Sequence, residues 1–195
     1  PAYIDIISAA NQINWISGTF SAWYNSTTAG SLRQIITHCG VGDGYGGTGD
    51  IEIYLATNDA NAPGSIAFTI FKDSKQALNI KSKETFNQWN HVVAAWNGSN
   101  NYGFLYHNNT LIGSSLQTIE LVAGSLTSFK LGRAQTTPER SFYGFIDEFA
   151  LFNRALINTE VNQIYQNGYT KFKTLQTEPT ITLKNQNQNI IIKEV

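Results

Sequence analysis

The sequence predicts an all-β fold, a sandwich or barrel of antiparallel strands with one short helix near the C-terminus. Three observations support it. Short alternating or apolar runs recur along the chain, clusters of Gly, Asn, Asp and Ser separate them, and a single segment shows helical spacing. The chain has 195 residues, a length typical of one sandwich domain.

The expected strands each lie between turn residues. In chain order they are Tyr3–Ile7, Gly18–Tyr24, Gln34–His38, Ile51–Ala56, Ile66–Phe71, Asn90–Trp96, Tyr102–His107, Thr118–Val122, Ser128–Leu131 and Phe145–Phe152. The run Val92–Trp96 is apolar on both alternating faces, which indicates a strand covered on both sides. We expect Trp23, Trp89 and Trp96, which fall within or beside these runs, to belong to the core.

The helix is expected to begin at Asn158, whose side chain can cap it, and to end at Gly168 after about two turns. Val161, Ile164 and Tyr165 share one face of such a helix, which must therefore lie on the sandwich. We assign residues 1–173 to one domain. Residues 174–195 form a C-terminal extension, interpreted as an edge hairpin or as a linker to another module.

Charge excludes some partners. The chain carries 13 basic and 14 acidic side chains, a net charge of −1, and no basic run, so nucleic acid and anionic membranes are not expected partners. No apolar run approaches the roughly 18 residues of a membrane helix, so no membrane insertion is expected. Cys39 is the single cysteine, which excludes an internal disulfide.

Four segments have distinctive residue patterns: Gly18–Tyr24, Phe86–Val93, Phe104–Asn109 and, most specifically, Phe142–Leu156 with the helix that follows. Together they resemble the laminin-G-like domains of the concanavalin A-like lectin/glucanase superfamily. The resemblance covers about residues 3–168 and implies a jelly roll of two curved antiparallel sheets. Asn109 replaces the Gly of the family's hairpin, and the segment from Thr170 onward has no counterpart.

Asp147 is the most informative acidic residue. Regular alternation along Phe145–Phe152 would place Asp147 on the face of Phe149 and Leu151, where a carboxylate needs a cation, an arginine such as Arg133 or Arg154, or backbone N–H groups. Many relatives in the resembled family hold calcium near the sheet rim. Two hypotheses stay open: a structural hydrogen-bonding role for Asp147, or a calcium site that includes Asp147 and Asp50.

The segment Gly40–Asp50 contains a G-x-G-x-x-G string, but a strand follows it rather than a helix, which argues against nucleotide binding. It can be a plain connecting loop. Alternatively it is a binding loop in which Tyr45 offers a ring face and Asp43 offers carboxylate oxygens.

Further candidates for ligand binding lie in the Asn-rich turns: Asn100, Tyr102, Asn108 and Asn109. Sugars bind by stacking on aromatic rings while amides and carboxylates satisfy their hydroxyl groups. Ordinary turn chemistry explains the same asparagines, so both interpretations stay open.

Catalytic patterns are not evident. The E-x-D-x-x-E string of jelly-roll glycosidases is absent, Asp50 and Glu52 fit a solvated strand edge, and no G-x-S-x-G elbow occurs. The sequence therefore favours a non-catalytic recognition module that binds carbohydrate or a glycoconjugate at an extracellular, cell or virion surface. The alternatives are an adhesive module that binds another protein, such as a neighbouring module of a larger chain or assembly, and a divergent hydrolase or lyase.

Overall fold

The computed structural model describes most of the chain. The described residues are 3–6, 16–27, 34–41, 51–59, 62–73, 75–116, 128–134, 140–174, 181–185 and 188–192.

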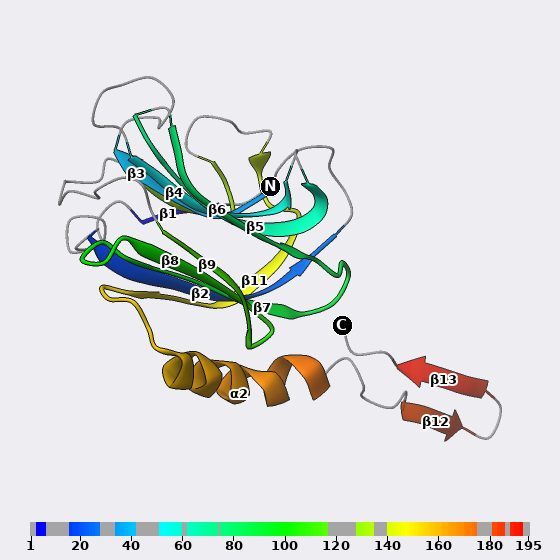
Figure 1. Cartoon of the computed structure of the whole chain (residues 1–195). Helices are drawn as coiled ribbons and strands as arrows, with labels where there is room; N and C mark the ends of the chain where they lie inside the picture. Colours follow the sequence, from blue (N-terminus) through cyan, green and yellow to red (C-terminus); the bar gives the residue numbers. More distant parts are fainter. Residues whose placement is uncertain are drawn as a thin grey trace.

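Two antiparallel sheets form a sandwich (Figure 1). The six-stranded sheet runs in the order β1 (Ile4–Asp5), β10 (Ser128–Leu131), β3 (Gln34–Val41), β4 (Ile51–Asp59), β5 (Ala62–Lys72) and β6 (Lys75–Lys83). The five-stranded sheet runs in the order β11 (Gly144–Phe152), β2 (Ser17–Ser26), β7 (Asn90–Asn97), β8 (Tyr102–His107) and β9 (Thr110–Leu116). The predicted jelly-roll sandwich is confirmed.

The core lies between the sheets because each strand points alternate apolar residues inward. Phe20 and Trp96 from the five-stranded sheet and Phe68 from the six-stranded sheet are fully buried there. The rings of Phe20 and Trp96 lie 5.0 Å apart. Trp23 is also buried, but on the opposite face of β2. Trp89 is half-buried outside this core, so the expectation that it is a core residue is wrong.

The helix α2 (Asn158–Thr174) covers the outer face of the five-stranded sheet (Figure 1). Its rings Tyr165 and Phe172 stack on Trp23, with centroids 5.5 and 4.8 Å away. The helix has 17 residues and continues past Gly168, so the predicted length of two turns is wrong. Gly168 serves packing instead: a Cβ atom there would lie 2.1 Å from Nε1 of Trp23.

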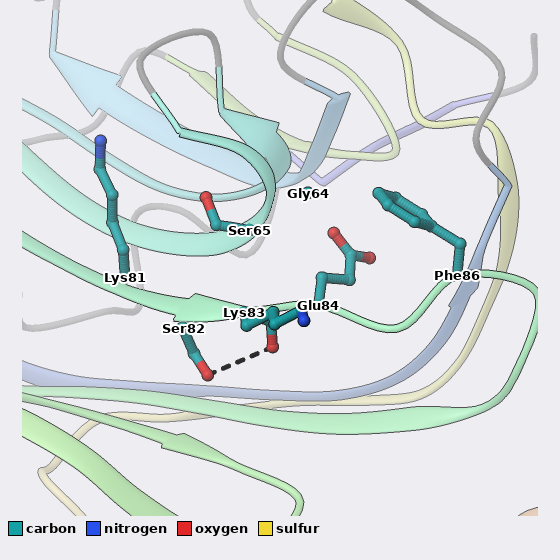
Figure 2. Close-up of a pocket in the computed structure, with 7 residues that line it drawn as sticks. All are labelled: Gly64, Ser65, Lys81, Ser82, Lys83, Glu84 and Phe86. Carbon is teal, nitrogen blue, oxygen red and sulfur yellow. Dashed lines mark hydrogen bonds between the residues drawn. The ribbon is translucent and has the colours of Figure 1, made fainter.

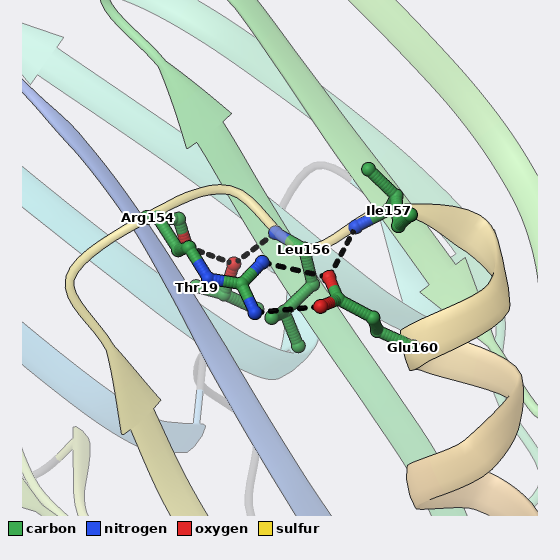
Figure 3. A network of polar contacts seen from close by, with 5 residues as sticks. All are labelled: Thr19, Arg154, Leu156, Ile157 and Glu160. Atoms are coloured by element: carbon green, nitrogen blue, oxygen red, sulfur yellow. Dashed lines mark hydrogen bonds and ion pairs between the residues drawn. The ribbon is translucent and has the colours of Figure 1, made fainter.

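The start of α2 also differs from the expected cap. Asn158 is the first helical residue, and the N–H of Ile157 donates to Oε2 of Glu160 at 3.0 Å, the reciprocal half of a capping box (Figure 3). Arg154 donates two hydrogen bonds to the same carboxylate, at 2.6 and 2.7 Å. Arg154, followed by the N–H of Ile157, lowers the pKa of Glu160 to about 2.

Two strands were not anticipated from the sequence, β6 and β9. Lys81 and Lys83 occupy alternate positions near the end of β6, and Leu78 and Ile80 before them enter the core. In β9 the apolar residues Leu111 and Ile112 are adjacent and both exposed, so no alternation marks the strand. The strand expected at Thr118–Val122 lies outside the described residues.

Strand β11 contains a bulge that changes which face each residue occupies. Asp147 pairs with Trp23 and Ala150 pairs with Ser21, so Glu148 and Phe149 together oppose one residue of β2. Glu148 has a φ of 49°. As a result Phe149 turns into the core while Asp147 stays on the outer face, and the alternation expected from the sequence is wrong beyond this point.

The C-terminal extension contains a hairpin of β12 (Ile181–Asn185) and β13 (Gln188–Ile192), which form a two-stranded sheet of their own. Its register pairs Ile181 with Ile192 and Leu183 with Ile190. The interpretation of residues 174–195 as a linker to another module stays a prediction. Among the described residues, no helix has the length and hydropathy needed to cross a bilayer.

Candidate functional site

A pocket lies at one end of the six-stranded sheet, where β5 begins and β6 ends (Figure 2). Its volume is about 600 Å³. We call it the rim pocket. It is lined by Gly64, Ser65, Lys81, Ser82, Lys83, Glu84 and Phe86.

Strand register explains how these side chains meet. Ser65 pairs with Lys83, and Ala67 pairs with Lys81, so the hydroxyl and the two lysines share the outer face while Ile66 and Ile80 enter the core. Gly64 has a φ of 74°, a left-handed conformation that glycine adopts without strain. Its carbonyl accepts the N–H of Glu84 at 2.8 Å, which closes this end of the sheet pair.

Glu84 and Phe86 give the rim pocket its two most distinctive groups. Glu84 is only 4% exposed, and one carboxylate oxygen accepts a hydrogen bond from the hydroxyl of Ser26. Phe86 is half-buried, and in Figure 2 its ring lies on the same side of the pocket as the Glu84 carboxylate. The pocket therefore combines an aromatic ring, a buried carboxylate, a hydroxyl and two ammonium groups.

Beyond the rim pocket, a row of polar residues crosses the outer face of the same sheet: Asp5, Lys130 and His38, followed across β4 by Thr69 and Asn79. In the strand register, Tyr54 of β4 pairs with His38 on one side and with Thr69 on the other. Thr69 is fully buried, yet its Oγ1, like the Oδ1 of Asn79 beside it, has no hydrogen-bond partner in the described part of the chain. Buried polar atoms without a protein partner are unusual and are commonly satisfied by an ordered water.

At the β1 edge of this face, two cations approach one ring. The guanidinium carbon of Arg133 lies 4.6 Å from the ring centroid of Tyr3, and Nζ of Lys130 lies 5.3 Å from it. Lys130 also forms an ion pair with Asp5 at 2.7 Å. We call Tyr3, Lys130 and Arg133 the basic cluster.

Two histidines are buried in structural hydrogen bonds. His107 joins the sheets, with Nδ1 3.2 Å from the Ser82 hydroxyl of β6 and Nε2 3.2 Å from the Tyr24 hydroxyl of β2. Burial, with a contribution from Lys173, lowers the pKa of His107 to about 4. Burial, with a contribution from His107, lowers the pKa of His91 to about 3. Both rings are therefore neutral at pH 7 and act as hydrogen-bonding groups.

The Asn-rich turns do not converge on one site. Asn100 and Tyr102 lie at one end of β8, and Asn108 and Asn109 follow its other end, roughly 20 Å away for a strand of this length. Oδ1 of Asn100 accepts the N–H of Tyr102 at 3.3 Å. Tyr102 is 40% exposed and lies over Phe104.

The other pair of asparagines is engaged within the protein. Asn108 accepts the N–H of His91 at 2.9 Å and donates to Oδ1 of Asn90 at 3.0 Å. Asn109 donates to Oδ1 of Asn162 in α2 at 2.7 Å. Both asparagines have positive φ angles, as the turn chemistry of asparagine allows.

Asp147 faces α2. Its Oδ2 lies 3.1 Å from Nζ of Lys171, which also contacts Glu148 at 2.8 Å, and its Oδ1 accepts the N–H of Glu148. Each acidic side chain is about half exposed, so the expected buried environment and the arginine partners are wrong: the bulge turns the acids outward, where Lys171 meets them. The ammonium group of Lys171 thus lies beside Asp147, at a position where a calcium ion would require further oxygen ligands.

The remaining predicted residues, Asp43, Tyr45 and Asp50, lie outside the described residues. Within the described ranges, no group of three or more His, Cys, Asp or Glu side chains is arranged to hold a metal ion.

Sequence reasoning missed the rim pocket because it missed β6. A usable signal was present: Leu78 and Ile80 alternate with Asn79, Lys81 and Lys83, the pattern of a strand with one buried face. The lysines obscured it.

Comparisons with solved structures show the same fold. A carbohydrate-binding module, the CBM40 of the Ruminococcus gnavus IT-sialidase bound to α2,3 sialyllactose, superposes with a TM-score of 0.67 at 17% identity, covering 84% of this chain and 92% of that chain. A heptameric SAP-like pentraxin from Limulus polyphemus superposes with a TM-score of 0.58 at 13% identity, covering 78% and 71%. The NanB sialidase of Streptococcus pneumoniae gives 0.65 at 17% identity, but only 26% of that chain is covered.

A search of curated protein sequences gave no match. A family profile described as the concanavalin A-like lectin/glucanases superfamily matches residues 3–162, most of the chain. Together with the two-sheet sandwich and the strand-to-helix closing block, this match shows that the chain is a laminin-G-like member of that superfamily.

Proposed function

We propose that this protein is a non-catalytic module that binds carbohydrate, or the carbohydrate of a glycoconjugate, at the rim pocket. The observation that carries the proposal is the pocket's combination of a half-buried ring, Phe86, with a buried carboxylate, Glu84. Sugar rings stack on aromatic faces and need nearby acceptors and donors for their hydroxyl groups. Ser65, Lys81 and Lys83 supply the donors.

The relatives in fold support the ligand class. One of them is a carbohydrate-binding module with sialyllactose bound.

A binding role is favoured over hydrolysis by the carboxylates that line the rim pocket. Retaining glycosidases use two carboxyl groups about 5 to 5.5 Å apart. Glu84 is the single carboxylate among the lining residues, and a serine holds it in the wall of the pocket.

The setting of the module is also part of the proposal. A net charge of −1 and many Asn, Ser and Thr residues suit a module exposed at an extracellular, cell or virion surface. Calcium remains a proposed cofactor through Asp147 and Asp50. Binding assays with millimolar calcium and with chelator, repeated on Asp147→Asn, test it: loss of binding in chelator and in the variant supports the metal.

The experiment that tests carbohydrate binding is a glycan-array screen followed by titration of the best hit. Phe86→Ala is expected to weaken that hit at least tenfold because the stacking surface is lost. Tyr102→Ala is the matched control, since it removes an exposed aromatic ring from the other sheet. Thermal melts confirm that both variants fold. Binding that survives Phe86→Ala unchanged would place the ligand elsewhere.

Protein adhesion is a second candidate because of edge strand β9. Leu111 and Ile112 are 49% and 37% exposed there, on the last strand of the five-stranded sheet. Exposed apolar sheet edges accept strands from partners. A folded protein with no array hits, whose pull-down partners are lost in Leu111→Lys, would support adhesion instead.

A further inference from the structure

The basic cluster contains a charge that the described protein does not neutralise. Arg133 is half-buried, and its Nε is buried without a hydrogen-bond partner in the described part of the chain. Lys130 differs, because Asp5 neutralises it at 2.7 Å. The one described contact of the Arg133 guanidinium is the ring of Tyr3, at 4.6 Å.

A half-buried guanidinium that has no carboxylate partner favours the binding of an anion. Partial burial removes water from the charge, and a carboxylate partner normally compensates for that loss. A ring stacked against the guanidinium attracts it by a cation–π interaction and orients its plane. The planar fork of an arginine then suits the two oxygens of a carboxylate or a sulfate.

The position of Arg133 relates it to the rim pocket. Arg133 follows the end of β10, where the N–H of Gly132 donates to the carbonyl of Ile36 near the start of β3. Ser65 of the rim pocket lies near the start of β5, at the same end of the sheet. Strand order puts three strand spacings between β10 and β5, roughly 14 Å. A short oligosaccharide can span that separation.

We propose that the basic cluster is an anion subsite, in which Arg133, oriented by Tyr3, binds the carboxylate or sulfate of an acidic glycan whose neutral part occupies the rim pocket. This inference rests on the proposed function for the neutral part of the ligand. With this subsite, the module is expected to bind acidic oligosaccharides in preference to neutral ones.

The first experiment compares an oligosaccharide that contains a uronic acid with the same oligosaccharide after carboxyl reduction. Wild-type protein is expected to bind the acidic form about tenfold more tightly, in keeping with a charged hydrogen bond, and to lose this preference as salt rises. Arg133→Gln should abolish the preference and leave affinity for the reduced form unchanged. Lys75→Gln, an exposed charge at the other end of β6, should keep the preference.

A second measurement separates the two proposals. Sodium glucuronate, with glucose as the neutral control, is titrated while the NMR signal of the Arg133 Nε–H group is followed. A shift with glucuronate alone supports the anion subsite even if no oligosaccharide binds, in which case only the proposed function fails. Absence of any shift, or equal affinity of wild-type protein for the acidic and reduced oligosaccharides, overturns the subsite.

Discussion

The two sheets of this sandwich use their outer faces in opposite ways. The outer face of the five-stranded sheet lies under α2, where Tyr165 and Phe172 stack on Trp23 and shield its ring from water. The outer face of the six-stranded sheet carries the polar row, the basic cluster and the rim pocket.

The two outer faces therefore contribute differently to the stability of the fold. Burial of aromatic surface stabilises a fold, whereas buried polar atoms without partners destabilise it. Both faces contain a buried polar atom without a hydrogen-bond partner in the described part of the chain, Nε1 of Trp23 under α2 and Oγ1 of Thr69 in the polar row. The helix-covered face combines it with stacked aromatic rings, which stabilise that layer.

Trp23→Ala should produce the largest effect, because it removes the ring on which α2 packs. Loss of a buried tryptophan costs about 4 kcal/mol of unfolding free energy. Urea denaturation measures this change. Tyr102→Ala, which removes an exposed ring, should change stability by less than about 0.5 kcal/mol. Equal losses in the two variants would contradict the stabilising role of the helix-covered face.

Acidification should destabilise the fold through His91 and His107. Their folded pKa values, about 3 and about 4, lie below the ordinary value of 6.5, so the unfolded chain binds more protons between these limits. Their contribution to stability is complete above pH 6.5 and declines as the pH falls toward 4. From pH 7 to pH 5 the loss should be on the order of 3 kcal/mol.

Denaturation of wild-type protein at several pH values tests this dependence. His107→Gln should flatten the curve between pH 7 and pH 5, because glutamine keeps polar groups but does not titrate. An unchanged pH dependence in that variant would assign the acid sensitivity to other groups.

Gly168→Ala should destabilise the protein by about 2 kcal/mol, the usual cost of overpacking, because the new methyl group would meet the indole of Trp23. The same change in a Trp23→Ala background should cost much less. Gln166→Ala, an exposed position on the same helix, is the control. A cost that persists without the indole would refute the steric explanation.

Thr69→Val should have the smallest effect and the opposite sign. The hydroxyl of Thr69 is buried and unsatisfied by the described residues, so an apolar side chain of the same shape should stabilise the fold by up to about 1 kcal/mol. Urea denaturation measures the change. A loss of stability in this variant would mean that the hydroxyl of Thr69 is hydrogen-bonded in solution, for example by an ordered water.

The fold was largely predictable because alternation and turn residues are local signals. The strands around Trp23 and Val92 and the closing block from Phe142 were all evident from sequence. The length of α2 was not, because Gly168 looks like a helix terminator unless the indole beneath it is known. Strand β6 was not predicted because its lysines make the segment look like an exposed loop, and two of them, Lys81 and Lys83, line the rim pocket.

The candidate site was harder to predict than the fold. Glu84 and Phe86 are far from Ser26 and Gly64 in sequence, and only strand pairing brings them together. Arg133 and Tyr3 are also far apart in the sequence, and the pairing of β1 with β10 brings them together. Asn100 and Asn108, by contrast, drew attention through local composition, although the turns they occupy explain their side-chain hydrogen bonds.

The bulge at Glu148 determines which face of β11 each following residue occupies. The extra residue lets one strand serve two layers, with Phe145 on the helix side and Phe149 in the core. Deletion of the extra residue, Glu148, would leave Phe149 alone opposite Ala22, so the strand would alternate strictly and every residue beyond it would keep its face. Loss of Glu148 should therefore be compatible with the pairing of β11, whereas a one-residue shift elsewhere in the strand would exchange its two faces.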